Sequence, residues 1–552
     1  VPRLTDPDVQ WPWPEFPELL VKTDEQTLEK IKPDPSITFQ VPSSGKSGHA
    51  SGAAKVTLAL TRYKQLHRVE ATRNTGYPNT WQCKAMLMLN GFAQTTLGFV
   101  PQEHDRSKDD MGLATLFYEM GYDVWLFDYR VSPLLESSKL RCSMDDIAEH
   151  DVPMAIDQVL ATLRDELTAR VHGSSPGEDP LPQDARLQIS CFAHCVGAAS
   201  LVMSLLSGRL RHQKVPALDT GDPPSKLSAM TLSNMQAYLV ASSTAQTRLG
   251  FGALARDLLN IDYFRLSAAE REPSAFEVVL DRVFGSLPVD PGEECPGEYS
   301  RFTPNPAMCT CKRMSGTISR LLRHDRLLPA THEKLPVYFG RANTGVLAHG
   351  ARCVEHERLV NADGQNVYVT DDNVHRHMGL PVALLHGRHN PLFRAESAER
   401  TYDQLARIHP QLAQKRIIRL LIAEDFAHFD CTIGHGQEMR QQILDPLRIF
   451  FDDAWTFNCQ QAQPTQAVVA PATRLVPPRG GPIIGWTRPH TQPDKSVGVL
   501  LRVWIEVNDT QGTLAHWALT RLTLGNQQHI DALWPVQRIP LWSDLSMQPN
   551  PC

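Results

Sequence analysis

The chain has 552 residues, of which 42% are hydrophobic and 21% are charged, and its formal net charge is -6. This composition is ordinary for a globular protein, and the mild charge provides no electrostatic basis for binding nucleic acid or an anionic membrane. No apolar run reaches the length of a membrane span. The 11 cysteines are too sparse for a disulfide scaffold. The length predicts one large domain with additions, or two to three domains.

The N-terminal part of the chain predicts an arm followed by alternating strands and helices. Residues 1–54 are rich in Pro, Asp and Ser and predict an extended arm that packs on the main domain. Residues 56–63 alternate as a strand should, and the apolar run at 85–89 predicts a buried parallel strand. The next predicted elements are a helix over 109–120, a strand over 123–128 and a helix over 152–168.

Residues 187–206 combine a strand, a sharp turn and a helix. Residues 193–197 read Ala-His-Cys-Val-Gly, where a nucleophile elbow usually reads Gly-x-Ser-x-Gly. Small neighbours tolerate the strained backbone of an elbow, and the N-terminus of the following helix favours a thiolate. The pattern predicts Cys195 as a nucleophile. The alternative is a buried structural cysteine, since free cysteine is among the most buried residue types.

The strand and helix rhythm is interrupted once and then resumes. After a strand at 226–232, residues 234–378 lose the alternation and predict a lid over the carboxyl ends of the strands. A strand at 380–387, a helix at 395–408 and a strand at 415–422 complete the core. The pattern predicts an α/β fold with a mostly parallel sheet covered by helices, formed by core segments 55–233 and 379–455.

The C-terminal segment, residues 456–552, has a different character. Residues 460–495 are rich in Pro and Gly, and two alternating strands follow at 497–507 and 514–524. This segment predicts a small antiparallel β appendage.

A cysteine nucleophile needs a base. In α/β-hydrolases the chain order is nucleophile, acid and histidine, and the histidine follows the last core strand. His428 occupies that position and is the predicted base, although a surface-loop histidine is the alternative. His435 is a nearby competitor, but it lies at the expected start of a helix.

The sequence offers more than one residue that could orient the base. The usual acid position, in the loop after Gly387, holds Asn390, whose side chain can accept a hydrogen bond from an imidazole as in Cys-His-Asn enzymes. We therefore predict that Asn390 orients His428. The alternative is that Asn390 is a turn residue and that Asp371, Asp372 or another carboxylate takes this role.

Backbone donors for an oxyanion are expected in two places. One is the N–H of Val196, directly after the nucleophile, and the other is the N–H of Phe92 or Ala93, in the glycine turn after the strand at 85–89. A simple strand-to-loop glycine is the alternative for this turn. His194 either lines the pocket with Ala93 or packs in the core.

Cys295, Cys309 and Cys311 form a local cysteine group. They could supply half of a zinc site, but no fourth ligand is obvious, and a local disulfide or reduced thiols are favoured. No G-x-G-x-x-G flavin motif opens the chain. We therefore expect neither a metal nor an organic cofactor.

Several motifs together resemble a known family. The chain resembles the α/β-hydrolase domains that are fused to, or encoded with, GMC-type cholesterol-oxidase-like flavoproteins. The matching motifs lie at 90–94, 121–130, 193–197, 331–332, 339–343, 386–390 and 428–431. The family usually has an acidic residue just before the asparagine, where this chain has His389. The resemblance implies an α/β-hydrolase fold over about residues 55–450, a cysteine nucleophile and association with a GMC-type oxidoreductase.

We predict a cysteine-dependent hydrolase of a small-molecule ester, lactone or thioester, which acts through an acyl-cysteine intermediate. The first alternative is an acyltransferase or lactone-forming enzyme that uses the same intermediate but excludes water. The second is a non-catalytic module that binds a sterol-like or acyl ligand, and the asparagine at position 390 is its best support.

Overall fold

The computed structural model describes residues 16–22, 28–43, 55–65, 82–100, 111–173, 186–212, 225–243, 245–246, 261–267, 295, 306–461, 490–491, 497–509 and 512–524. The chain divides into two compact units, Val1–Thr456 and Phe457–Cys552. The two units are described separately below. No helix among the described residues is long and apolar enough to cross a membrane.

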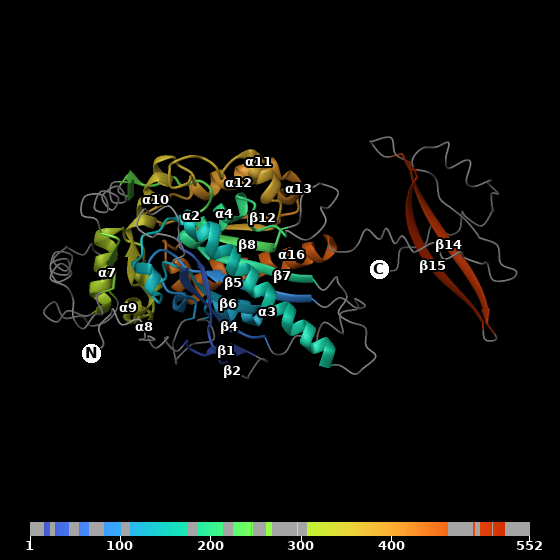
Figure 1. Cartoon of the computed structure of the whole chain (residues 1–552), viewed down its shortest axis with the longest axis horizontal. Helices are drawn as coiled ribbons and strands as arrows, with labels where there is room; N and C mark the ends of the chain where they lie inside the picture. Colours follow the sequence, from blue (N-terminus) through green and yellow to red (C-terminus); the bar gives the residue numbers. More distant parts are fainter. Residues whose placement is uncertain are drawn as a thin grey trace. The chain divides into compact units, whose positions relative to one another are not determined.

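An eight-stranded sheet forms the centre of the first unit, in the order β12-β11-β8-β7-β5-β6-β4-β3 (Figure 1). Of these eight strands, β4 runs against both of its neighbours and the other pairings are parallel. The strands are β3 (Ile37–Pro42), β4 (Lys55–Tyr63), β5 (Gln82–Leu89), β6 (Asp123–Asp128), β7 (Arg186–His194), β8 (Leu227–Ser233), β11 (Val382–Gly387) and β12 (Ile418–Ala423). This arrangement confirms the predicted α/β-hydrolase fold.

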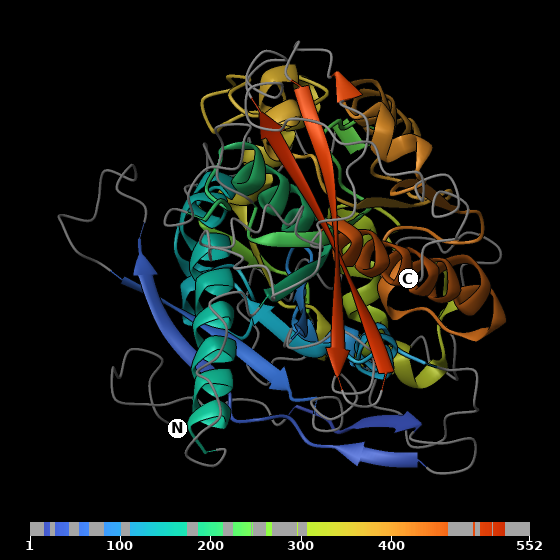
Figure 2. The same cartoon turned by 90° about the vertical axis from the view of Figure 1, so that its right-hand side faces the viewer.

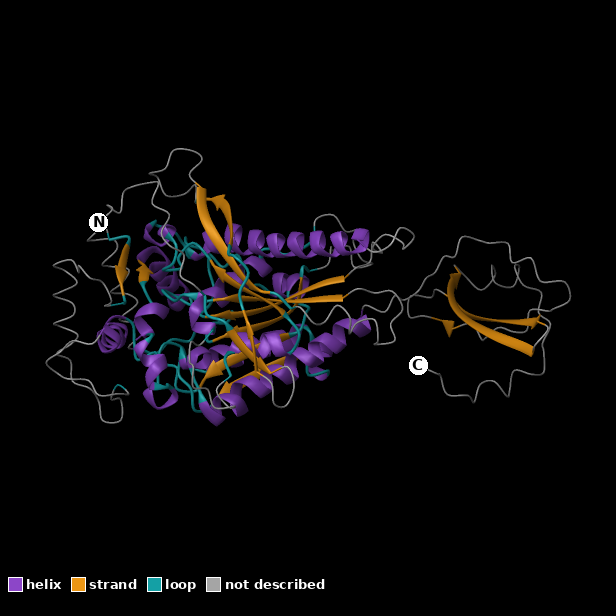
Figure 3. Ribbon diagram, turned by 90° about the horizontal axis from the view of Figure 1, so that it is seen from below, coloured by secondary structure: helices purple, strands orange, loops and turns teal. Residues whose placement is uncertain are grey.

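The central strands are apolar because both faces of the sheet are covered. Figure 3 shows helices on both sides of the sheet. On one side α3 and α4 pack together; on the other, Phe117 of α1 meets Phe451 of α16 edge to face, with ring centroids 5.3 Å apart. These helices are α1 (Leu113–Glu119), α3 (Val152–Gly173), α4 (Val196–Leu206) and α16 (Asp445–Gln461), and α12 (Glu396–Ile408) packs on β11 and β12.

The predicted N-terminal arm contains a strand of the main sheet. β3 pairs with β4 in an antiparallel ladder from Ile37–Leu60 to Pro42–Lys55. A separate hairpin precedes it, formed by β1 (Leu19–Lys22) and β2 (Leu28–Ile31). Residues 1–15, which include Trp11 and Trp13, lie outside the described residues.

The insertion between β8 and β11 packs directly against loops at the carboxyl ends of the strands. The backbone N–H of Thr95, after β5, donates to Tyr338 O at 2.7 Å, and the N–H of Gly340 donates to Ala93 O at 2.9 Å. The described elements of the insertion are β9 (Tyr263–Arg265), α7 (Pro306–Thr317), η5 (His324–Arg326), α8 (Pro329–Glu333), α9 (Leu335–Tyr338), β10 (Arg341–Asn343), α10 (Thr344–Glu355) and α11 (Asp371–His377). A lid over the carboxyl ends of the strands would make contacts of this kind. That the insertion acts as a lid remains a prediction.

Shorter elements connect the core. They are η2 (Thr96–Phe99), η3 (Glu136–Lys139), α2 (Met144–Asp146), η4 (Ile147–Asp151), α13 (Pro410–Gln414), α14 (Asp430–Ile433), α15 (Gly436–Met439) and η6 (Arg440–Leu444).

The second unit contains the predicted antiparallel strands. β14 (Val497–Asp509) pairs with β15 (Gly512–Leu524) along its whole length, and β13 (His490–Thr491) adds a short third strand (Figure 2).

Candidate active site

Cys195 lies at a strained turn between β7 and α4. Its φ of 51° and ψ of -122° place a non-glycine residue in the left-handed half of the map. Its N–H donates to Ser233 O at the end of β8, at 2.8 Å. A Cβ at Gly197 would collide with the carbonyl oxygen of Asn90 and lie 2.9 Å from Leu89 Cβ. The small residue at 197 is therefore required by the close approach of the two strand ends, as in a nucleophile elbow.

The two predicted oxyanion donors influence the protonation of Cys195. Burial raises the pKa of the Cys195 thiol to about 11, and hydrogen bonding from the backbone N–H groups of Phe92 and Val196 opposes the rise. Cys195 is 4% exposed, so the thiol is neutral at pH 7 and is nearly closed off from solvent.

Hydrogen bonds hold the glycine turn that contains Phe92. Gly91 N–H donates to Gln94 Oε1 at 3.0 Å, and the hydroxyl of Tyr129 donates to Asn90 O at 2.8 Å. Ala93 is buried and has a φ of 54°. These contacts fix the backbone of the turn that contains Phe92.

His428 is delivered by the loop after β12, as predicted. Its ring is fully buried, 5.0 Å from the His194 ring and 6.3 Å from the Phe393 ring between centroids. Neither ring nitrogen forms a hydrogen bond with any described group. Burial, and then the nearby rings of His194 and His386, hold the pKa of His428 well below its usual value. The imidazole is therefore neutral and retains a free lone pair.

The backbone of His428 is held on both sides. Its N–H donates to Leu321 O in the insertion at 3.2 Å, and Phe429 N–H donates to the same oxygen at 2.9 Å. Its carbonyl accepts from Asn234 Nδ2 at 2.7 Å. The competitor, His435, instead precedes α15, where its N–H donates to Arg326 O.

His194 is fully buried beside the elbow. Its Nδ1 lies 3.0 Å from Ser233 Oγ, and burial lowers the pKa of the ring to about 3. A Cβ on Gly91 would lie 2.8 Å from His194 Cδ2, so the ring fills the space under the glycine turn. His194 packs between this turn and His428.

The predicted hydrogen bond between Asn390 and His428 is not formed, so the sequence prediction was wrong on this point. Asn390 Oδ1 accepts the backbone N–H groups of Leu392 at 3.0 Å and Phe393 at 3.3 Å. Its Nδ2 donates to Asn234 Oδ1 at 3.3 Å. Asparagine side chains readily satisfy their own turn in this way.

The two alternative carboxylates also lie elsewhere. Asp371 is exposed and accepts from Arg407 at 2.8 Å and from Gln404 at 3.0 Å. Asp372 pairs with Arg376 at 3.0 Å on the surface of α11. Neither contacts the His428 ring.

Asn234 links the end of β8 to β11 and to the loop of His428, and the sequence analysis did not identify it. It follows β8 with a φ of 61° and is fully buried. Besides holding the His428 carbonyl, its Oδ1 accepts from Gly387 N at 2.8 Å, and its own N–H donates to Leu385 O at 2.9 Å. The available signal was an asparagine directly after a strand, because asparagine tolerates the left-handed conformation better than most residues.

The chain has only distant similarity to known proteins. No family model and no curated protein matches the chain. Solved structures that resemble it include a monoglyceride lipase from Saccharomyces cerevisiae, at 8% identity with 73% of this chain and 94% of that chain covered and a TM-score of 0.41. An esterase from Thermogutta terrifontis has 13% identity, coverage of 76% and 99%, and a TM-score of 0.37. A hydrolase from Pseudomonas aeruginosa PA01 has 11% identity, coverage of 74% and 99%, and a TM-score of 0.36. These likenesses are too remote to assign a substrate.

Proposed function

We propose that the chain is a cysteine-dependent hydrolase of small-molecule esters, lactones or thioesters. The observation that carries the proposal is the positive-φ backbone of Cys195 at the turn between β7 and α4. The backbone N–H groups of Phe92 and Val196, which lower the pKa of its thiol, support it. A neutral imidazole lies beside the residue that precedes this cysteine. A structural cysteine would need neither the strained backbone nor the paired donors.

The resting thiol and imidazole are both neutral, which determines how the nucleophile is activated. Burial disfavours the charged form of each group, and an ion pair between Cys195 and His428 is therefore not the ground state. His428 acts as a general base that takes the thiol proton as Sγ bonds to the substrate carbonyl carbon.

The remaining steps follow from the same groups. As the S–C bond forms, the carbonyl electron pair moves to oxygen, and the N–H groups of Phe92 and Val196 bind the oxyanion. The intermediate collapses, the C–O or C–S bond breaks, and the leaving group takes the proton from His428. In the second half His428 takes a proton from water, hydroxide adds to the acyl carbon, and Cys195 leaves and is reprotonated.

The test is hydrolysis of p-nitrophenyl esters, lactones and N-acetylcysteamine thioesters by matched variants. Cys195→Ala and His428→Gln are expected to lower kcat/KM by about 10³-fold or more. Cys191→Ala, which removes a buried thiol on β7, is the control and keeps activity within a few-fold. Mass spectrometry of quenched reactions should locate the acyl group on the peptide that contains Cys195. Undiminished turnover by Cys195→Ala, or the absence of both turnover and acylation in the native chain, would refute the proposal.

Acyl transfer is the second candidate, and the burial of the site favours it. His428 is fully buried and Cys195 is nearly so, which limits the access of water to an acyl-cysteine. Products formed with an added alcohol or amine acceptor, compared with water alone, separate transfer from hydrolysis. The GMC-type partner implied by the family resemblance is also a proposal, and co-purification with such a flavoprotein would test it.

A further inference from the structure

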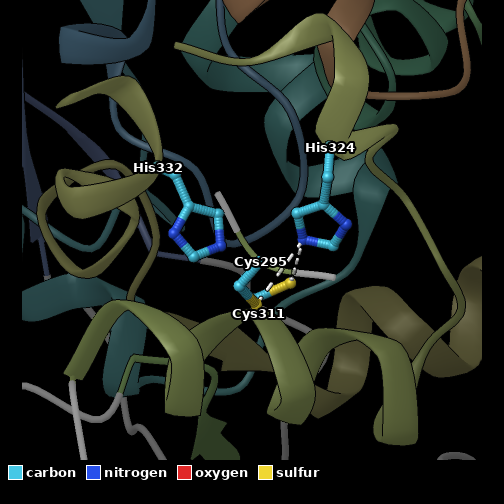
Figure 4. A group of neighbouring side chains, drawn as sticks. All are labelled: Cys295, Cys311, His324 and His332. Atoms are coloured by element: carbon cyan, nitrogen blue, oxygen red, sulfur yellow. Dashed lines mark hydrogen bonds between the residues drawn. The ribbon is translucent and has the colours of Figure 1, made fainter. Parts of the chain in front are cut away.

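Four potential metal ligands lie together in the insertion, and none of them is among the proposed catalytic residues. Cys311 lies on α7, His324 on η5 and His332 on α8, and Cys295 lies earlier in the chain. Figure 4 shows the two sulfurs between the two imidazole rings. Among the described residues, one group of at least three His, Cys, Asp or Glu side chains is placed so that it could hold a metal ion. It consists of these four residues.

The distances within the cluster suit a single tetrahedral ion. All four donor atoms lie within 4.8 Å of one another. Nε2 of His324 lies 3.0 Å from the sulfur of Cys311 and 3.8 Å from that of Cys295. With Zn–S bonds of about 2.3 Å and Zn–N bonds of about 2.0 Å, neighbouring ligands of a tetrahedral zinc are about 3.3–3.8 Å apart. The observed spacing needs only small side-chain shifts to reach that geometry.

The chemistry of the donors narrows the choice of metal. Two thiolates and two neutral imidazoles balance the charge of a divalent cation, and the S₂N₂ set is typical of structural zinc. Cys311 and His332 are buried, so a bound ion would be shielded from solvent on that side. No disulfide joins Cys295 and Cys311, and reduced thiols were one of the two states that the sequence favoured. The sequence analysis expected no metal because it found no further ligand for the cysteine group, and the structure brings His324 and His332 to Cys295 and Cys311.

We infer that Cys295, Cys311, His324 and His332 bind one structural Zn²⁺. Binding displaces one proton from each thiol to solvent and forms two Zn–S and two Zn–N bonds. Four protein ligands leave no open position, so the ion has no direct part in catalysis. This inference rests on the cluster alone and does not depend on the proposed hydrolase activity.

The metal site lies beside a segment that holds the loop of His428 in place. Leu321 lies in the chain between Cys311 and His324, and its carbonyl accepts the backbone N–H groups of His428 and Phe429. Arg326, just after His324, accepts the N–H of His435 through its carbonyl and pairs with Glu438 at 3.2 Å. An ion held by Cys311 and His324 therefore fixes both ends of the segment that holds the loop of His428.

The decisive experiment is metal analysis of the full chain expressed in zinc-supplemented medium. Elemental analysis should find about one zinc per chain, and Cys311→Ser or His324→Gln should reduce this to less than about a tenth. Cys309→Ser is the matched control, because Cys309 lies on the same helix outside the cluster, and it should keep the zinc. The two ligand variants should also unfold at lower temperature than the control.

A second readout covers the case in which the ligand variants do not fold. Native protein stripped of zinc by a chelator and reloaded with Co²⁺ should show the visible bands of tetrahedral cobalt and a thiolate-to-cobalt charge-transfer band. A native chain without stoichiometric zinc and without this spectrum would overturn the inference, as would a Cys295–Cys311 disulfide in the native protein. Equal zinc content in Cys311→Ser and Cys309→Ser would overturn it as well.

Discussion

At the scale of single residues, the candidate site consists of neutral groups held in a dry environment. Cys195 and His428 would each titrate inside the physiological range if exposed more fully or paired differently. Burial moves the thiol pKa up and the imidazole pKa down, so neither group is charged at pH 7. In the proposed mechanism the attack therefore requires proton transfer from Cys195 to His428, and we expect the pH dependence of activity to report the buried imidazole.

The acid limb of the pH profile is the first prediction. His428 acts as a base only when neutral, and its depressed pKa keeps it neutral at pH values below 6.5. The rings of His194 and His386, which face it, have pKa values of about 3 and about 4 and remain neutral over the same range. We expect kcat/KM to stay constant from pH 7.5 down through about 6.5 and to fall only at lower pH. A midpoint at or above 6.5 would contradict this account of the site.

The second prediction concerns Asn390, which occupies the position that usually carries the acid. Its oxygen already accepts two backbone N–H groups, and its amide donates to Asn234. Asn390→Asp would remove that donor and place two oxygens together, so it should not raise kcat/KM and should destabilise the fold by about 1–3 kcal/mol. Denaturant unfolding and steady-state kinetics measure both effects, and Asn390→Ala provides the comparison. A tenfold gain in kcat/KM for the aspartate would show that position 390 orients the base after all.

At the scale of elements, close approach of backbones positions the site. The turn after β11 passes directly over the loop that follows β12, and His389 N–H donates to Phe426 O at 2.9 Å. A Cβ on Gly387 would collide with the Ala427 carbonyl oxygen and lie 2.5 Å from that of Phe426. The glycine is thus required by the loop that delivers His428.

The third prediction follows from this contact. Gly387→Ala should displace the His428 loop, lower stability by about 1–3 kcal/mol and reduce kcat/KM. The control is Gly350→Ala in α10, where an added Cβ meets nothing within 4 Å. Alanine within a helix should instead stabilise by about 0.5–1 kcal/mol. Equal unfolding midpoints for the two variants would show that the 387 contact is not constraining.

At the scale of the whole molecule, the sheet, the elbow and the base loop all lie in the first unit. The last element of its core is α16, where Phe450 and Phe451 are fully buried. Phe451 packs against Phe117 at 5.3 Å and Tyr122 at 6.0 Å. The first unit is therefore complete only when this helix is present.

The fourth prediction uses two truncations. A chain that ends at Gln461 retains α16 and should unfold cooperatively and keep the ester hydrolysis of the full chain. A chain that ends at Leu444 loses both phenylalanines, each worth about 1.5–3 kcal/mol of burial, and should fail to give a cooperative transition. Circular dichroism melts and activity assays separate the two. Loss of cooperative unfolding in the longer chain would show that the second unit is needed for the fold of the first.

The amino-acid sequence by itself determined the strands, the sharp turn at Cys195 and the position of His428 after the last strand of the sheet. Apolar runs and small residues at 193–197 report local requirements, namely burial on both faces of the sheet and crowding at a sharp turn, and both can be read from neighbouring positions. The tertiary structure alone decided the partners. Asn390 donates to Asn234 and not to His428. Asn234 in turn donates to the backbone carbonyl of His428. Cys295 lies beside His324, 29 positions later in the sequence. These contacts depend on which distant segments the packing brings together, and no local pattern records that.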